Sequence, residues 1–370
     1  MQARESKGIK LRHLSVRNFK VLDSLDVDFP PPLMEHDPDV IVLGSPNGGG
    51  KTSLLESCAL LFLTPVLGGY GRLAPDFNLP VTLEDLLIRA GAPGAEAKGR
   101  FEYEGGPQPS YLTLEFTIGR KKGGTFGYDG DLKPFQETMH DGDGRPFGYA
   151  APRDRERLLY SLIGLSSDPL IAAPFLYFHS YRKIEEGNIE LGAMLGEERG
   201  SGGPARQRPW GASSVFKREI LRCMMSRADL LEDVNEKQAE EAFAKLNGLV
   251  QEYAGGTIEK LRASRDSTIE IRITPAAGGQ PFPFDGLSSG QKEIISTLFL
   301  IWRYTRTRPG IVLIDEPELH LNAEWHRNFV RNVHKLAPWN QYIIATHSED
   351  VFASVEEDRR FLLSVTAEAR

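Results

Sequence analysis

Cysteine is scarce in this sequence, which holds only Cys58 and Cys223 among its 370 residues. Each lies in an apolar, helix-like stretch, and neither has a neighbour at the spacing of a metal ligand. Free cysteine behaves in proteins as a small apolar side chain, so we expect two buried thiols and no cysteine metal site. This use of cysteine also predicts a cytoplasmic protein.

Long apolar segments and a positive net charge are missing as well. The first residues, MQARESKGIKLRHL, contain no apolar run of the kind that a secretory leader needs. The longest apolar runs, near 60–63 and 298–302, are far shorter than the roughly 20 residues that cross a bilayer. We therefore expect no membrane partner. Because the net charge is −7, any contact with DNA has to come from a local basic patch.

The composition that remains is that of a globular protein, with 40% apolar and 26% charged residues. Alternating apolar and polar residues predict two strands joined by a turn over 9–29. An apolar segment at 39–44 predicts a buried strand, and a Gly-rich stretch then leads into a helix over 52–62. Strand, Gly-rich turn and helix in this order are the setting of a phosphate-binding loop.

The rest of the chain divides into a mixed middle part and a regular end. In the middle we expect a strand over 111–118, a hairpin with loops over 119–150, one buried strand over 170–178, a mobile linker over 196–212, helical structure over 213–253 and a strand over 268–273. From Gly286 onward we expect helices over 289–304, 321–336 and 349–357 that alternate with strands over 311–314, 341–345 and 360–365. This alternation favours an α/β fold with a largely parallel sheet.

Residues 44–52, GSPNGGGKT, have the composition of a phosphate-binding loop. Small residues let backbone N–H groups converge on a phosphate, the lysine reaches the β and γ oxygens, and the hydroxyl after it binds Mg²⁺. The strict pattern, GxxxxGK[ST], has glycine where this sequence has Ser45. A Gly-rich hairpin turn before Lys-Thr is the alternative, and the flanking strand and helix argue against it. The loop predicts ATP binding by Asn47, Gly48, Gly49, Gly50, Lys51 and Thr52, with Lys51 also catalytic and Thr52 also a Mg²⁺ ligand.

Residues 311–317, IVLIDEP, form an apolar strand that ends in two acids. Asp315 is placed to hold Mg²⁺, directly or through water. Glu316 is placed to orient and deprotonate the attacking water. Acids often end a strand without any catalytic role, but the phosphate loop upstream favours the catalytic interpretation.

Two further segments have the character of site loops. In GLSSGQKE, residues 286–293, Ser288 or Ser289 is a natural N-cap for the helix that follows, and a helix N-terminus also attracts anions. In YIIATHS, residues 342–348, an apolar strand ends in Thr-His. Taken alone, the first predicts only a capped helix and the second only a strand end.

In their order along the chain, these four segments resemble the ABC ATPases. LSSGQ looks like the family's LSGGQ signature, and His347 resembles its switch histidine, which contacts the γ-phosphate and the attacking water. Within the family the chain resembles the branch that contains the RecF, SMC and OLD-type ATPases, through LRHLSVRNFKVLDSLDVDF at the start, DEPELHL at 315–321 and ATHS at 345–348. Asn322-Ala323 stand where the OLD-type pattern has His-Pro.

The resemblance implies a P-loop NTPase head of ABC type, with a mixed sheet, N-terminal antiparallel strands and a helical insert. It implies a catalytic role for His347, and contacts from Ser288, Gly290 and Gln291 to the γ-phosphate bound by a second copy. Two ATP molecules with Mg²⁺ would then lie between two head-to-tail copies related by a twofold axis. Hydrolysis would release the dimer.

The long stretch between Lys51 and Ser288 implies an insert, with a discontinuous head over 1–185 and 270–370 and a linker plus short helical insert over 186–269. No heptad pattern is sustained in the helical part, which excludes a long coiled-coil arm. An arginine is typical at the position of Arg182 in OLD-type ATPases, so the resemblance offers a nucleotide or partner contact for Arg182 beside the interpretation as an exposed strand-end arginine. Basic clusters could bind DNA phosphates or be solvated surface; they comprise Arg206, Arg208, Lys217, Arg218 and Arg222, and then Arg303, Arg306 and Arg308.

These features support three functional hypotheses. The leading one is a dimeric ATPase that acts as sensor or motor for a separate effector, such as a nuclease, in prokaryotic DNA repair or antiphage defence. OLD-type proteins commonly carry a nuclease domain after the ATPase, and few residues follow His347, so we expect the nuclease to be a separate protein. The second is a nucleotide-gated scaffold that holds a toxin or nuclease inactive. The third is the ATP-binding subunit of a transporter, against which the insert and residues 318–321 argue.

Overall fold

A computed structural model describes residues 8–34, 37–45, 48–67, 83–103, 110–119, 123–131, 161–162, 167–172, 174–190, 214–227, 236–263 and 268–363. The chain divides into two compact units, residues 1–181 with 304–370 and residues 182–303. The expected linker at 196–212 and most of the expected loops after 131 lie outside the described residues. Within the described part, no helix has the length and apolarity that crossing a membrane requires.

The first unit contains a six-stranded sheet in the order β15-β3-β14-β13-β8-β7. Its five strands from β15 to β8 are parallel, as predicted. Every residue of β3, β13 and β14 is buried, which explains why these strands read as continuous apolar runs. The strands are β3 (Val40–Gly44), β7 (Leu170–Ala172), β8 (Phe175–Phe178), β13 (Ile311–Asp315), β14 (Gln341–Thr346) and β15 (Arg360–Leu362).

The segment 170–178 forms two strands, and the prediction of a single one was wrong. β7 runs antiparallel to β8, and the chain reverses at Pro174, since proline cannot donate to a strand ladder. The carbonyl of Pro174 instead accepts a hydrogen bond from the Ile311 N–H at 3.1 Å. A Cβ at Gly310 would lie 1.6 Å from this oxygen, so only glycine fits at the start of β13.

A second, antiparallel sheet has the order β2-β1-β4-β5-β6. Its strands alternate buried and exposed residues, as a sheet with one wet face does. The strand pair predicted over 9–29 and the strand at 111–118 are confirmed, and β6 forms the described part of the hairpin expected within 119–150. The strands are β1 (Ile9–Phe19), β2 (Leu22–Asp28), β4 (Gly94–Tyr103), β5 (Ser110–Gly119) and β6 (Gly123–Asp129), with a short helix α2 (Leu83–Leu87) before β4.

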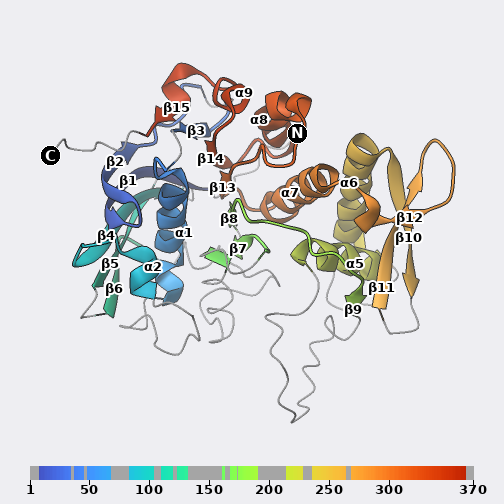
Figure 1. The fold of residues 1–370 in the computed structure, drawn as a ribbon, viewed down its shortest axis with the longest axis horizontal. Coiled ribbons are helices and arrows are strands. Elements are labelled where there is room, and N and C mark those ends of the chain that lie inside the picture. Colours follow the sequence, from blue (N-terminus) through green and yellow to red (C-terminus); the bar gives the residue numbers. More distant parts are fainter. Residues whose placement is uncertain are drawn as a thin grey trace, which may run out of the picture. The chain divides into compact units, whose positions relative to one another are not determined.

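Helix α1 (Lys51–Leu67) joins the cores of the two sheets (Figure 1). The ring of Phe62 stacks on Phe175 of β8 at 4.2 Å and meets Phe101 of β4 edge-on at 6.5 Å. The helix runs past its predicted end at Phe62 and includes Pro65. Pro65 has no N–H to give to the carbonyl of Leu61, but the Thr64 hydroxyl donates to this oxygen at 2.5 Å, so the acceptor stays bonded. Cys58 on α1 is buried, as expected, and so is Cys223.

The C-terminal elements follow the predicted order with different ends. The Asn322 side chain accepts from the Trp325 N–H and caps α8 (Ala323–Leu336), so the asparagine that stands where the OLD-type pattern has histidine acts as an N-cap. The helix predicted over 349–357 was too long. α9 spans only Glu349–Phe352 with Ser348 as its N-cap, and a 3₁₀ turn at Glu357–Arg359 leads into β15.

In its described residues, the second unit combines the helices α5, α6 and α7 with a four-stranded sheet (Figure 1). Phe216 of α5 packs against Phe284 and Phe299 with ring centroids 5.4 and 5.8 Å apart. The helical structure predicted over 213–253 is confirmed where the structure describes this range, as is the strand at 268–273, whereas β10 was not predicted. The elements are β9 (Ile189–Glu190), α5 (Val215–Arg227), α6 (Glu236–Ala254), β10 (Gly256–Ala263), β11 (Thr268–Pro275), β12 (Phe282–Pro283), a 3₁₀ turn at Phe284–Gly286 and α7 (Ser289–Thr305).

The second compact unit extends to Arg303, beyond the insert boundary expected at residue 269. The reason is that α7 packs on the insert helices. Besides the Phe216–Phe299 contact, Arg303 of α7 donates to Glu219 of α5 at 3.1 Å. The signature segment at the start of α7 therefore belongs to the same unit as the insert.

Candidate nucleotide site

The Gly-rich loop expected to bind phosphate lies between β3 and α1, as predicted. Gly48 and Gly50 have φ values of 78° and 85°, which favour glycine. At Gly50 a Cβ would also lie 2.4 Å from the Leu22 side chain, so the turn between β1 and β2 packs closely on the loop. Asn47 lies outside the described residues, as does Pro46.

In this loop, glycine is found at position 44, one residue before the place where the strict pattern has it, and the structure explains both Gly44 and Ser45. A Cβ at Gly44 would lie 2.7 Å from the ring of Phe352, so glycine at this position makes room for α9. Ser45, which stands where the strict pattern has glycine, accepts from the Lys51 ammonium through both its carbonyl and its hydroxyl oxygen, at 3.0 Å each. The departure from the pattern thus supplies a side-chain partner for the loop lysine.

Lys51 is buried at the first position of α1, with 5% of its surface exposed. Burial lowers the pKa of its ammonium, while the negative charges of Glu316, Asp315 and Glu318 oppose that shift. Its Nζ lies 3.4 Å from Nδ1 of His347. A cation in partly desolvated surroundings beside three carboxylates is suited to an anionic ligand that brings its own Mg²⁺.

Thr52 and Asp315 meet at the carboxyl end of the parallel sheet. The Thr52 hydroxyl donates to Oδ2 of Asp315 at 2.8 Å, and Asp315 is fully buried. A hydroxyl and a carboxylate are hard oxygen donors of the kind that Mg²⁺ prefers, with water and phosphate oxygens as its other ligands. The described residues contain no group of three or more His, Cys, Asp or Glu that could hold a metal ion by themselves. The donor set therefore fits Mg²⁺ that arrives with a nucleotide.

Glu316 and His347 face each other across the ends of β13 and β14. Nε2 of His347 lies 3.4 Å from Oε1 of Glu316, and both side chains are partly exposed, at 36% and 25%. Glu316 has a left-handed backbone, with φ of 49°, and its N–H donates to the carbonyl of Ala345 at 2.8 Å. This conformation is costly for glutamate and recurs at functional sites. The structure thus brings together Lys51, Thr52, Asp315, Glu316 and His347.

Glu318 is a contributor for which the sequence offered only its place in the DEPE segment. Its Oε2 accepts from the Thr346 hydroxyl at 2.7 Å, and its Oε1 accepts from the His347 N–H at 2.6 Å. Both contacts cross from the loop after β13 to the end of β14.

The signature segment forms a reciprocal cap at the start of α7. The Gln291 N–H donates to the Ser288 hydroxyl at 3.2 Å, and the Ser288 N–H donates to Oε1 of Gln291 at 3.0 Å, which is a capping box. The Gln291 side chain also donates to the carbonyl of Tyr253 at 3.0 Å. Ser288 is exposed and Gly290 is buried. Since the Ser288 oxygen is the acceptor in this cap, its hydroxyl proton can still be donated to a ligand.

Several basic residues that the sequence offered for ligand contacts form ion pairs inside the second unit. Arg182 is buried and pairs with Glu293 at 2.5 Å, so the alternative of an exposed strand-end arginine was wrong, and the nucleotide or partner contact stays a prediction. Arg222 and Arg303 both pair with Glu219 at 3.1 Å. Arg206 and Arg208 lie outside the described residues.

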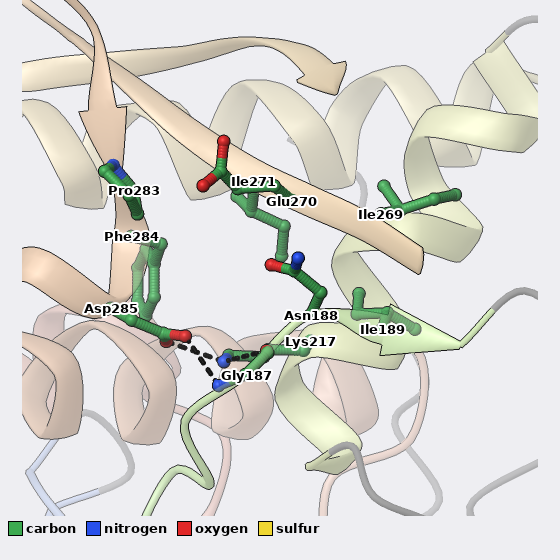
Figure 2. A pocket seen from close by; sticks show the side chains of 10 residues that line it. All are labelled: Gly187, Asn188, Ile189, Lys217, Ile269, Glu270, Ile271, Pro283, Phe284 and Asp285. Carbon is green, nitrogen blue, oxygen red and sulfur yellow. Dashed lines mark hydrogen bonds and ion pairs between the residues drawn. The ribbon is translucent and has the colours of Figure 1, made fainter. Parts of the chain in front are cut away.

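Lys217, another member of the predicted basic cluster, is 2% exposed and pairs with Asp285 at 2.6 Å (Figure 2). The Lys217 ammonium also donates to the carbonyl of Gly187 at 2.8 Å, and the Gly187 N–H donates to Asp285 at 2.8 Å. The contacts close one side of a small pocket lined by residues of α5 and β11 (Figure 2). Lys217 is a structural cation and does not form part of a DNA-binding surface.

Comparison with known proteins gives matches in both sequence and fold. A family described as "AAA domain, putative AbiEii toxin, Type IV TA system" matches residues 224–353, which include Ser288, Asp315, Glu316 and His347. The OLD nuclease of Thermus scotoductus is 24% identical over 363 residues, which are 93% of this chain and 60% of that protein. The chain thus spans less than two thirds of this relative.

Shorter matches link the chain to two retron proteins. The Retron Vc95 probable ATPase of Vibrio cholerae is 30% identical over 112 residues, 28% of this chain and 21% of that protein. The Retron Ec83 probable ATPase of Escherichia coli is 33% identical over 87 residues, 21% of this chain and 16% of that protein. The expected absence of a fused nuclease stays a prediction beside these partial matches.

Among solved structures, the SMC head domain from Thermotoga maritima is 14% identical, with a TM-score of 0.45 over 94% of this chain and 92% of that one. An SMC head bound to the C-terminal winged-helix domain of ScpA is 15% identical, with a TM-score of 0.48 over 93% of this chain and 91% of that one. Scores of this size carry no weight for function, which depends on the residues of the site.

Proposed function

We propose that this chain, which belongs to the RecF/SMC/OLD branch of the ABC-type ATPases, binds ATP with Mg²⁺ and hydrolyses it between two head-to-tail copies. Its fold is that of the P-loop head predicted from the sequence. The observation that carries the proposal is the convergence of Lys51, Thr52, Asp315, Glu316 and His347 at the carboxyl ends of β3, β13 and β14.

Each of these side chains has a role that suits its place. Lys51 binds the β and γ oxygens after exchanging Ser45 for phosphate as its partner. Thr52 and Asp315 would hold Mg²⁺, which would offset negative charge on the phosphates. Glu316 accepts a proton from the attacking water, and His347, 3.4 Å from Glu316, orients the γ-phosphate. Gly48, Gly49, Gly50 and Asn47 supply backbone groups around the β-phosphate.

The second copy supplies the signature segment. The exposed Ser288 has a hydroxyl proton to donate, and the N-terminus of α7, which begins with Ser289 and the buried Gly290, is an electropositive helix end. Gln291 keeps this turn in place through its bonds to Ser288 and Tyr253. A twofold dimer would therefore bury two nucleotides, each held by the loop of one copy and the signature of the other.

The relatives' names suggest the setting. One is an OLD nuclease, two are retron ATPases, and the matching family is described by a toxin–antitoxin system. On this analogy we assign the chain to prokaryotic antiphage defence or DNA repair, as the ATPase that controls an effector such as a nuclease. DNA is a candidate ligand of the complex, and the cytoplasm is the location expected from the sequence.

The test is the mass in solution of the Glu316→Gln protein, with and without ATP and DNA. This variant keeps the shape of the site and removes the base, so ATP should convert monomer into a dimer that persists. Lys51→Met/Glu316→Gln is the matched control and should not respond. A further gain in mass with DNA would support a nucleic-acid clamp. A mass already at dimer or above, indifferent to ATP and DNA, would favour the scaffold hypothesis, in which other surfaces hold the assembly.

A further inference from the structure

We infer that Glu318 is a positioning residue for the proposed switch histidine: its carboxylate fixes the backbone of Thr346 and His347 and so sets the imidazole between Glu316 and Lys51. The inference rests on the proposed ATPase function. It assigns a task to a side chain whose hydrogen bonds reach the backbone of His347, while the imidazole itself lies 3.4 Å from Lys51 and 3.4 Å from Glu316.

Both oxygens of the Glu318 carboxylate are used. Oε1 accepts from the His347 N–H at 2.6 Å, and Oε2 accepts from the Thr346 hydroxyl at 2.7 Å. The Thr346 oxygen then accepts from the Ser348 N–H at 2.9 Å. Bonds to an ionised carboxylate are shorter and stronger than bonds between neutral groups. One side chain thus holds three consecutive residues at the end of β14.

The loop that carries Glu318 is itself held at its backbone. The backbone carbonyl of Glu318 accepts from the Leu321 N–H at 3.1 Å and from Nε2 of His326 at 3.0 Å. The Leu319 N–H donates back to the carbonyl of Glu316 at 3.2 Å. Glu316 and His320, on either side, have left-handed φ values of 49° and 66°. Such strained backbones persist where the surroundings over-determine them, so Glu318 projects from a rigid turn.

This arrangement places the acid and the histidine in one unit. Glu316 lies in the same turn as Glu318, two residues earlier, and its own N–H is bonded to Ala345 on β14. Because the Glu318 carboxylate accepts from the His347 N–H, it fixes the histidine relative to that turn. The distance of 3.4 Å between Nε2 of His347 and Oε1 of Glu316 then depends on the hydrogen bonds that Glu318 accepts from Thr346 and His347, which are 28 and 29 residues further along the sequence. Positioning of this kind affects the chemical step more than binding.

ATP binding depends mainly on other residues. Lys51 and Thr52 come from α1, and their hydrogen bonds with Ser45 and Asp315 do not involve Glu318, whose charge ranks after those of Glu316 and Asp315 in its effect on Lys51. Removing the carboxylate should therefore lower kcat and leave the KM for ATP nearly unchanged. A residue that merely supported the fold would affect both.

The experiment compares Glu318→Ala and Glu318→Gln with Glu349→Gln, a control that neutralises an exposed carboxylate two residues after His347. Glu318→Ala should lower kcat about ten- to a hundredfold, with KM within about twofold of the parent. Glu318→Gln should recover part of the rate, because its carbonyl can accept from His347 and its amide can donate to Thr346. Glu349→Gln should match the parent.

Amide hydrogen exchange without nucleotide gives a second readout that is independent of activity. The amides of His347 and Ser348 should exchange faster in Glu318→Ala, less so in Glu318→Gln, and at the parental rate in Glu349→Gln. If Glu318→Ala fails to fold, the glutamine variant carries the test.

The outcomes separate the two proposals. A parent that binds ATP but never hydrolyses it would overturn the proposed function, while the exchange result would still decide the role of Glu318. A parental kcat with unchanged exchange would overturn the inference. So would an equal loss of ATP binding and hydrolysis, because this would mark a structural residue.

Discussion

Thr52 and Asp315 are 263 residues apart in the chain, yet the hydroxyl of one donates to the carboxylate of the other at 2.8 Å. The parallel order β3-β14-β13 brings this about, because it places the start of α1 and the end of β13 at the same edge of the sheet. Ligand sites of open α/β sheets lie at that edge. The pair links the Gly-rich loop to the acidic strand.

The first prediction concerns Mg²⁺. Thr52→Ala removes the hydroxyl, so the variant should need about tenfold more Mg²⁺ for the same ATP affinity, as loss of a well-placed ligand usually requires. Thr52→Ser is the matched control, since it keeps the hydroxyl and loses only a methyl group. Titration of ATP binding with Mg²⁺ distinguishes them. Equal Mg²⁺ dependence in parent and Thr52→Ala would contradict the assignment of Thr52 as a metal ligand.

The second prediction concerns the cost of burying Lys51. Burial lowers the pKa of Lys51, against the opposing charges of Glu316, Asp315 and Glu318. The unfolded chain therefore binds this proton more tightly than the folded chain, and the charge costs folding free energy at neutral pH. That cost fades as pH rises through the lowered pKa toward the ordinary lysine value of about 10.4.

Lys51→Met should accordingly lose ATP binding while its Tm without nucleotide stays equal to the parent's or rises at pH 7. The difference in Tm should shrink at alkaline pH. Lys335→Met on the exposed face of α8 serves as the control and should change neither property. Thermal unfolding followed by fluorescence measures this. A Tm well below that of the parent at pH 7 would show that the charge stabilises the fold.

Much of the site could be predicted from the sequence because its chemistry is local. The roles expected of Lys51, Thr52, Asp315 and Glu316 follow from short segments in which a strand ends and a loop begins. The parallel strands were visible because strands buried on both faces are apolar throughout. The finer boundaries were not visible, since Thr64 replaces a missing hydrogen bond at Pro65 and Pro174 reverses the chain within an apolar run.

The features that the sequence did not reveal depend on contacts between residues that are far apart along the chain. Nothing near Glu318 in the sequence shows that its carboxylate reaches Thr346 and His347, because the contact depends on β13 and β14 being neighbours. For the same reason Arg182 and Lys217 resembled surface cations, although Glu293 and Asp285 neutralise them inside the second unit. The sequence shows that a residue is charged, but it does not show which residue will form an ion pair with it.

The third prediction concerns stability. Asp39 is buried and accepts from Arg12 at 3.1 Å and from Arg359 at 2.8 Å, joining β1, the residue before β3 and the turn before β15. Asp39→Ala leaves two buried guanidinium groups short of a partner and should cost about 3 kcal/mol of unfolding free energy. Glu96→Gln, which breaks the exposed pair with Arg17, should cost less than about 1 kcal/mol. Urea titration compares them, and equal losses would contradict the importance of burial.

The fourth prediction tests whether the signature acts on the second copy. Ser288→Arg should retain ATP binding by the phosphate loop and lose hydrolysis, because the bulky cation prevents closure. It also loses the cap to Gln291, at a cost of about 1 kcal/mol in stability. Lys51→Met should lose hydrolysis for lack of binding. Each protein alone is therefore inactive.

A mixture of the two should hydrolyse ATP. In a mixed dimer, the intact loop of the Ser288→Arg copy faces the intact signature of the Lys51→Met copy, which restores one of two sites. Half the dimers in an equal mixture are mixed, so roughly a quarter of the parental rate should return. Mixing Lys51→Met with Thr52→Ala is the control, and it should recover less than that because both lesions lie in the same loop. If the Ser288→Arg and Lys51→Met mixture stays inactive while each protein still folds, the signature serves its own copy or no dimer forms, and the head-to-tail arrangement is wrong.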